Sequence, residues 1–180
     1  MPKNVVIVTS SLRKNSNSDA LAQAFARGAR EAGHTVEMIS LKGKSISFCQ
    51  GCLACQRTGH CVISDDAVAI AETIGHADVI AFASPVYYYG LSGQLKTLLD
   101  RCNPLYTRDY TFCSVYLLAS AAENEPNTVE GSVHGLKGWI DCFEKASLAG
   151  VIFAGGVTAS GEIARHPALE QAYEAGKAIG

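Results

Sequence analysis

The stretch V-V-I-V-T-S-S-L-R-K-N-S-N-S-D, residues 5–19, decides the fold class of this chain. Val5–Val8 is a short, continuous apolar run, the pattern of a parallel strand buried on both faces. The following loop, Thr9–Asp19, is polar, and its last residues are good helix caps. From Asn17 to Gly33 the apolar residues recur at helical spacing, and the glycine suits a helix stop. A buried strand, a polar loop and a helix in this order predict the first unit of an α/β fold.

The rest of the chain repeats this alternation. Further strands are predicted at Thr35–Leu41, Val79–Ala83, Phe112–Ala119 and Leu148–Ala154, and further helices at Ser64–Gly75, Ser92–Arg101, Glu130–Ala146 and Pro167–Ile179. Five strands alternating with five helices predict a parallel sheet with right-handed crossovers and helices on both faces. Two strand orders are compatible with this pattern. In either order, ligands bind at the carboxyl ends of the strands, so the loops there are the first candidates for a site.

The loop after the first strand carries hydroxyl, amide and cationic side chains directly before a helix. Its candidate binding residues are Ser10, Ser11, Arg13, Ser16, Asn17 and Ser18. Hydroxyls and free N–H groups at a helix N-terminus form an anion site. An ordinary N-cap is the alternative, but a cap needs only one such residue. The loop lacks both the G-x-G-x-x-G of dinucleotide sites and a P-loop, so the predicted anion is a single phosphate monoester.

The loop after the third strand, A-S-P-V-Y-Y-Y-G-L-S-G at residues 83–93, contains three consecutive tyrosines. Its candidate residues are Pro85, Val86, Tyr87, Tyr88, Tyr89 and Gly90. Flat aromatic faces and exposed backbone amides suit a planar heteroaromatic ring, and packing against a neighbouring subunit is the alternative. The small, polar loop after the fourth strand adds Ser120 and Ala121. A phosphate monoester joined to a planar ring, at the edge of a five-stranded sheet, describes FMN.

Four cysteines lie within thirteen residues in F-C-Q-G-C-L-A-C-Q-R-T-G-H-C-V, at Cys49, Cys52, Cys55 and Cys61. A metal or iron–sulfur site explains this density, because a soft centre needs thiolates converging from several directions. The alternative is a run of small, partly buried cysteines with one pair able to oxidise. His60, inside the same loop, is interpreted as a residue facing solvent.

Composition sets the class of protein. The chain has 180 residues, 48% of them hydrophobic and 18% charged, which predicts one globular domain over residues 1–180. A net charge of -2 gives no electrostatic reason to expect nucleic acid or an anionic membrane as a partner. We expect no long apolar span and no signal peptide. The seven cysteines, an odd number, argue against a disulfide framework and favour a reducing cytoplasm.

The sequence resembles the FMN-binding NAD(P)H-dependent oxidoreductases of flavodoxin-like fold, and within them the iron–sulfur flavoproteins. Three blocks carry the resemblance: S-S-L-R-K-N-S-N-S at 10–18, C-Q-G-C-L-A-C-Q-R-T-G-H-C-V-I-S-D-D at 49–66, and S-P-V-Y-Y-Y-G-L-S-G-Q-L-K at 84–96. The resemblance implies a three-layer α/β sandwich with five parallel strands in the order 2-1-3-4-5. It also implies FMN on the first and third blocks, and a [4Fe-4S] cluster on the four cysteines of the second.

The implied chemistry is hydride transfer from NAD(P)H to FMN, followed by electron transfer to a second acceptor, either a small molecule or a protein. The flavin carries out the chemical step, so we expect no catalytic side chain. Three alternatives stay open: an iron–sulfur flavoprotein electron carrier, a flavodoxin-type carrier without nicotinamide turnover, and an α/β protein without flavin. The apolar, aromatic surface of the tyrosine and cysteine loops predicts a homodimer or homotetramer.

Overall fold

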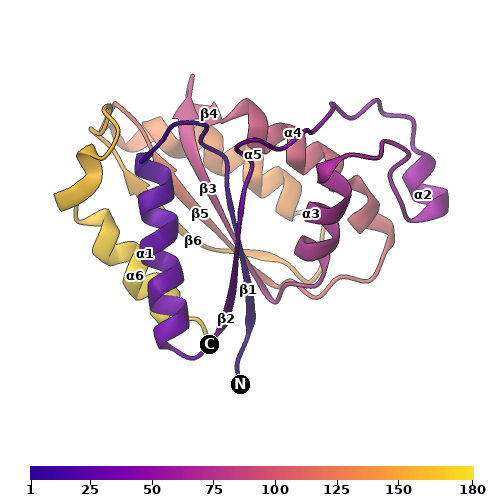
Figure 1. Ribbon diagram of the computed structural model, residues 1–180, viewed down its shortest axis with the longest axis horizontal. Helices are drawn as coiled ribbons and strands as arrows, with labels where there is room; N and C mark the ends of the chain where they lie inside the picture. Colours follow the sequence, from indigo (N-terminus) through magenta and orange to yellow (C-terminus); the bar gives the residue numbers. More distant parts are fainter.

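A parallel sheet forms the centre of the computed structural model, which describes all residues from Met1 to Gly180 (Figure 1). Its strands are β1 (Asn4–Thr9), β2 (Thr35–Ser40), β3 (Val79–Tyr87), β5 (Ser114–Ser120) and β6 (Ser147–Ala154), in the order β2-β1-β3-β5-β6. Counted along the chain, this is the predicted order 2-1-3-4-5, which is therefore confirmed. A sixth, two-residue strand that the sequence did not predict, β4 (Gly90–Leu91), pairs antiparallel with β3.

Helices cover both faces of the sheet (Figure 1). The helices are α1 (Asn17–Glu31), α2 (Ala54–Thr58), α3 (Asp66–Gly75), α4 (Gly93–Arg101), α5 (Glu130–Ile140) and α6 (Ala168–Lys177), with short 3₁₀ helices η1 (Asn103–Thr107), η2 (Pro126–Val129) and η3 (Glu162–Arg165). Along β1, Val5 and Ile7 pack with α1 and α6, whereas Val6 and Val8 pack with α3, α4 and α5. Burial on both faces explains why this strand is a continuous apolar run.

The two helices on one face, α1 and α6, approach each other through glycine. A Cβ added to Gly28 would collide with the carbonyl oxygen of Tyr173, and one added to Gly176 would collide with that of Phe25. The contact continues at the surface, where Tyr173 Oη donates to Glu31 Oε2 at 2.6 Å and Lys177 Nζ donates to Glu31 Oε1 at 3.1 Å. Backbone therefore meets backbone along this pair of helices.

Two predicted elements differ from the structure by more than two residues, and one short helix was not predicted. The helix predicted to run from Glu130 to Ala146 ends at Ile140, because the chain turns there and buries Phe143 against Phe112, with ring centroids 5.0 Å apart. Strand β3 continues to Tyr87, four residues beyond its predicted end. The cysteine segment contains the short helix α2, which projects from the sheet beyond α3 (Figure 1). No helix of the chain is long and apolar enough to cross a membrane.

Candidate functional site

The loop between β1 and α1 contains a candidate binding site at the N-terminus of helix α1. Ser16 caps α1, since its Oγ accepts from the N–H of Asp19 at 3.1 Å. The N–H groups of Asn17 and Ser18 belong to the first helical turn and have no protein partner, which leaves two donors for an anion. Ser10 has a different role. Its Oγ donates to the carbonyl of Ala83 at 3.0 Å and accepts from Ser92 Oγ at 2.8 Å, so it joins β1 to β3 and α4 inside the protein.

A cavity of about 210 Å³ opens above the carboxyl ends of the strands, where this loop meets two others. Ten of the predicted binding residues line it: Ser11, Arg13, Ser16, Asn17, Ser18, Pro85, Val86, Tyr87, Ser120 and Ala121. Ala122, Val157 and Thr158 complete the lining and were not predicted. The sequence therefore located three of the walls of the cavity and missed the fourth, which comes from the segment after β6.

The segment after β6 is held against the β1–α1 loop by long-range hydrogen bonds. Arg13 Nη1 donates to the carbonyl of Thr158 at 2.9 Å. The Asn17 amide donates to the carbonyl of Ala159 at 3.0 Å and accepts from the N–H of Ile163 at 3.3 Å. The Asn17 side chain thus positions the fourth wall, and the donors left for an anion are the serine hydroxyls, Arg13 and the free N–H groups. This donor set fits a phosphate group.

Arg13→Ala is expected to weaken FMN binding by about ten- to hundredfold, because a charge-assisted contact to a phosphate contributes about 1.5–3 kcal/mol. Fluorescence titration of the apoprotein with FMN measures the affinity. Lys14→Ala is the matched control, since Lys14 is the adjacent cation, is exposed and does not line the cavity. Equal affinities in the two variants would contradict a phosphate contact from Arg13.

The tyrosine loop is a tight β3–β4 hairpin. Tyr88 and Tyr89 form its two-residue turn with φ of 47° and 61°, left-handed values that cost about 1–2 kcal/mol for a residue with a Cβ. Tyr89 Oη donates to Glu123 Oε2 at 2.8 Å, which joins the hairpin to the loop after β5. Neither of these tyrosines nor Gly90 lines the cavity, and the Tyr88 side chain is 102% exposed. Strained backbone of this kind is concentrated at ligand sites.

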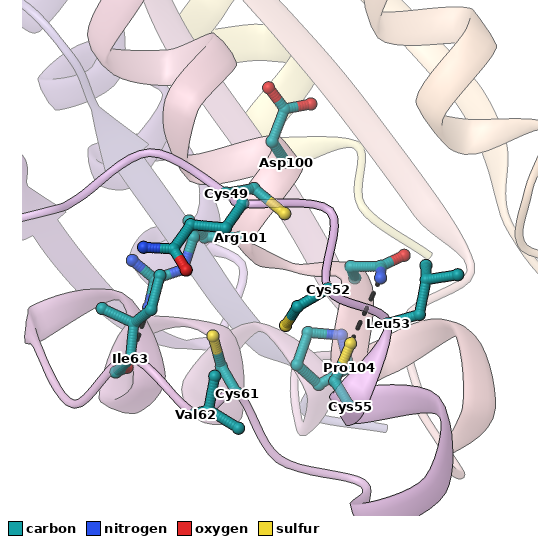
Figure 2. Close-up of a pocket in the computed structure, with 12 residues that line it drawn as sticks. Cys49, Cys52, Leu53, Cys55, Cys61, Val62, Ile63, Asp100, Arg101 and Pro104 are labelled. Atoms are coloured by element: carbon teal, nitrogen blue, oxygen red, sulfur yellow. Dashed lines mark hydrogen bonds between the residues drawn. The ribbon is translucent and has the colours of Figure 1, made fainter.

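The four cysteines of the second block border one small cavity of about 20 Å³ (Figure 2). Cys55 is buried, Cys61 is half-buried, and Cys49 and Cys52 are exposed. Asn103 Nδ2 donates to Cys55 Sγ at 3.2 Å, a contact that stabilises negative charge on sulfur. No three His, Cys, Asp or Glu side chains of the chain are arranged to hold a single metal ion. Four free thiols around one cavity, with an amide donor to one of them, fit a cluster in donor type, and the loop must widen to enclose one.

Arg101 and Asp65 fasten the cysteine loop at its base. Both oxygens of Asp65 accept from Arg101, at 2.7 and 2.9 Å, and the Arg101 side chain is completely buried. Arg101 also donates to the carbonyls of Ser47 and Ile63, which lie just before and just after the four cysteines. Burial acts to raise the pKa of Asp65, but hydrogen bonds from Arg101 and from the N–H groups of Ser47 and Ala67 lower it to about 2.

Arg101 and Asp65 were not among the predicted site residues. Asp65 caps α3, because its side chain accepts from the N–H of Ala67 at 3.1 Å. The helical pair Lys96–Asp100 is present at 2.7 Å, but Arg101 pairs across 36 residues with Asp65. His60 is exposed, as predicted. No local signal in the sequence indicates this long-range pair: Asp65 lies within the second block of the family resemblance, but Arg101 lies beyond the end of the third.

The strand order and the cavity at the strand ends define a flavodoxin-like α/β protein. The NADPH-dependent FMN reductase family matches residues 3–125, and the chain belongs to that family. Solved structures with the same fold include an NAD(P)H:quinone oxidoreductase from Methanothermobacter marburgensis, with a TM-score of 0.76, 21% identity and coverage of 100% of both chains. An azoreductase from Bacillus anthracis has a TM-score of 0.72 and 17% identity over 98% of this chain and 100% of its own.

Iron–sulfur flavoproteins are among the similar sequences. One from Archaeoglobus fulgidus is 31% identical over 136 residues, which cover 73% of this chain and 61% of the relative. One from Methanocaldococcus jannaschii is 39% identical over 101 residues, 56% of this chain and 52% of the relative. Another, from Methanosarcina thermophila, is 27% identical over 91% of this chain and 83% of its own length. The chain thus spans about half to three fifths of the first two relatives.

Proposed function

We propose that this protein is an FMN-dependent oxidoreductase that takes hydride from NAD(P)H and passes electrons to a second acceptor. One observation carries the proposal: the cavity at the strand ends joins a phosphate-type donor set to the tyrosine hairpin. Membership of the FMN reductase family supports it. FMN, when bound, would supply the hydride and electron chemistry.

In this proposal the residues of the cavity bind and orient. Ser11, Ser16 and Ser18, with Arg13 and the free N–H groups at the start of α1, hold the phosphate. Pro85, Val86 and Tyr87 border the ring on one side, and Ser120 and Ala121 border it on the other. Backbone donors in fixed positions would stabilise negative charge on the reduced ring without reorganising. No side chain is needed as a general base.

A second candidate function is an iron–sulfur flavoprotein electron carrier, with a [4Fe-4S] cluster on Cys49, Cys52, Cys55 and Cys61. Two observations favour it: the four thiols share one cavity, and several relatives are named iron–sulfur flavoproteins. The cluster would supply single-electron transfer beside the two-electron chemistry of the flavin.

We also propose that the protein is located in the cytoplasm. All seven cysteines are free thiols, and a reducing compartment keeps cysteines in that state.

Anaerobic addition of NADH or NADPH to the FMN-loaded protein tests the proposal. Loss of the yellow flavin colour with either nucleotide is the expected result. Flavin that stays oxidised would contradict the proposed hydride transfer and would favour a flavodoxin-type carrier without nicotinamide turnover. A protein that stays colourless after incubation with FMN would refute a flavin function of any kind.

We also propose that the protein is a homodimer or homotetramer. Large apolar side chains are exposed near both candidate sites, among them Tyr88 at 102% and Phe48 at 79%. Exposed patches of this kind mark interaction surfaces. Sedimentation at micromolar concentration is expected to give a multiple of the 19.0 kDa chain mass, and a mass of one chain would contradict the proposal.

A further inference from the structure

The buried guanidinium of Arg101 has one N–H group without a partner. Its Nη atoms are occupied by Asp65 and by the carbonyls of Ser47 and Ile63. Its Nε is buried and makes no hydrogen bond. Leaving a buried donor of a charged group unpaired is costly, and native proteins rarely do so without a ligand or function.

Arg101, which carries this unpaired Nε–H group, borders the cysteine cavity. Arg101 lines this cavity together with all four cysteines, and Figure 2 draws its side chain above Cys61. Cys61 and the guanidinium of Arg101 border the same cavity, and Nε makes no hydrogen bond to the thiol in the present arrangement.

The hydrogen bonds by which Arg101 holds the cysteine loop do not explain why its Nε–H group is buried without a partner. The contacts of Arg101 to Ser47 and Ile63, which lie on either side of the cysteines, use only the two Nη atoms. Arg108 offers a comparison, because it makes the same two-pronged pair with Glu72, at 2.7 and 2.9 Å, without bordering the cysteine cavity. What distinguishes Arg101 is complete burial and a free donor beside four thiols.

We propose that Arg101 is a positioning residue for the cysteine site, and that its Nε–H donates to a sulfur atom there, either Cys61 Sγ or a sulfide of the bound cluster. The inference rests on the second candidate function, because it assumes that the loop binds a cluster. A positive charge and a hydrogen bond at sulfur stabilise the more negative, reduced state of such a centre and raise its reduction potential. Asp65 opposes this effect, since its carboxylate lies against the same guanidinium.

The experiment compares three variants after anaerobic iron–sulfur reconstitution of the full chain. Arg101→Lys keeps the positive charge but removes the Nε–H group and the bidentate hydrogen bonding to Asp65. Arg108→Lys is the matched control, because it makes the same chemical change at a pair that does not border the cavity. Asp65→Asn keeps a good helix cap and removes the opposing charge. Iron content and the midpoint potential of the cluster, followed by EPR, are measured for each, with FMN binding as the check on folding.

Arg101→Lys is expected to shift the reduction equilibrium against the reduced cluster by about three- to tenfold, where tenfold corresponds to about 59 mV for one electron. Asp65→Asn is expected to shift it in the opposite direction, and Arg108→Lys to leave it unchanged. Simple opening of the loop would move both the Arg101 and the Asp65 variants in the same direction. The opposite signs therefore separate an electrostatic role from a purely structural one.

Different results overturn different statements. Iron absent from the native chain refutes the cluster and this inference together. Iron present in all variants, with the Arg101→Lys potential equal to that of Arg108→Lys, refutes this inference alone. If Arg101→Lys does not fold, Asp65→Asn still decides, because a potential that fails to rise in that variant contradicts a guanidinium acting on the cluster.

Discussion

The double variant Cys55→Ser/Cys61→Ser is expected to hold under about one iron per chain after anaerobic reconstitution, against about four for the native chain. The two thiols border the same cavity, and Cys55 also accepts from Asn103 at 3.2 Å. Serine keeps the size of each side chain but replaces a soft thiolate by a hard, protonated oxygen, which is a poor ligand for a cluster. Iron analysis, with the broad visible absorbance of a cluster, measures the loss.

Cys113→Ser is the control for this prediction. Cys113 is an exposed free thiol outside the cysteine loop and does not border the cavity. FMN affinity is expected to be the same in all three proteins, because none of these cysteines lines the cavity at the strand ends. Iron retained by the double variant would show that Cys55 and Cys61 are not ligands, and equal loss in Cys113→Ser would show that the loss is not specific to the cysteine loop.

The second large effect is expected from Gly131→Ala on α5, which should lower both the FMN affinity and the stability of the protein. A Cβ at this position would collide with the carbonyl oxygen of Tyr89 in the strained turn of the hairpin. Because the obstacle is backbone, Gly131→Ala must displace either the hairpin or the helix, and overpacking of this kind costs about 1–3 kcal/mol. We expect FMN affinity to fall by at least about tenfold, together with a loss of stability in chemical denaturation.

Gly135→Ala, one helical turn further along α5, is the matched control. No atom lies within 4 Å of a Cβ added there, so alanine meets open space. Alanine is a better helix former than glycine by about 0.8–1 kcal/mol, so this variant is expected to be more stable than the native chain and to bind FMN equally well. A gain in stability in Gly131→Ala as well would mean that the close approach between α5 and the hairpin does not constrain the flavin site.

The local pattern of apolar and polar residues was sufficient to predict most of the fold and much of the candidate site. Val5–Val8 is apolar at every position because helices cover both faces of β1, and such a run is readable from sequence. Ser16, Asn17 and Ser18 stand where a helix begins at the carboxyl end of a strand, so their place beside the cavity could be predicted from capping chemistry. The family resemblance supplied the strand order, which alternation alone left open.

What the sequence did not predict depends on contacts between distant segments. Thr158 reaches the cavity only because Arg13 and Asn17 bind the segment after β6. The Arg101–Asp65 pair joins α4 to the start of α3, and no local periodicity indicates it. The short strand β4 requires two tyrosines in left-handed conformations, which sequence statistics disfavour.

We expect the close approach of α1 and α6 through Gly28 and Gly176 to make one half of the molecule locally more stable than the other. Local unfolding requires least free energy where backbone is exposed and few apolar contacts hold it. The segment 42–53 is exposed along almost its whole length, whereas α1 is locked against α6, so amide hydrogen exchange should be fast in the first and slow in the second. The proposed phosphate anchor lies at the start of α1, in the slow half. Fast exchange in the segment 42–53 together with slow exchange in α1 would show that the cysteine loop opens while the start of α1 stays folded.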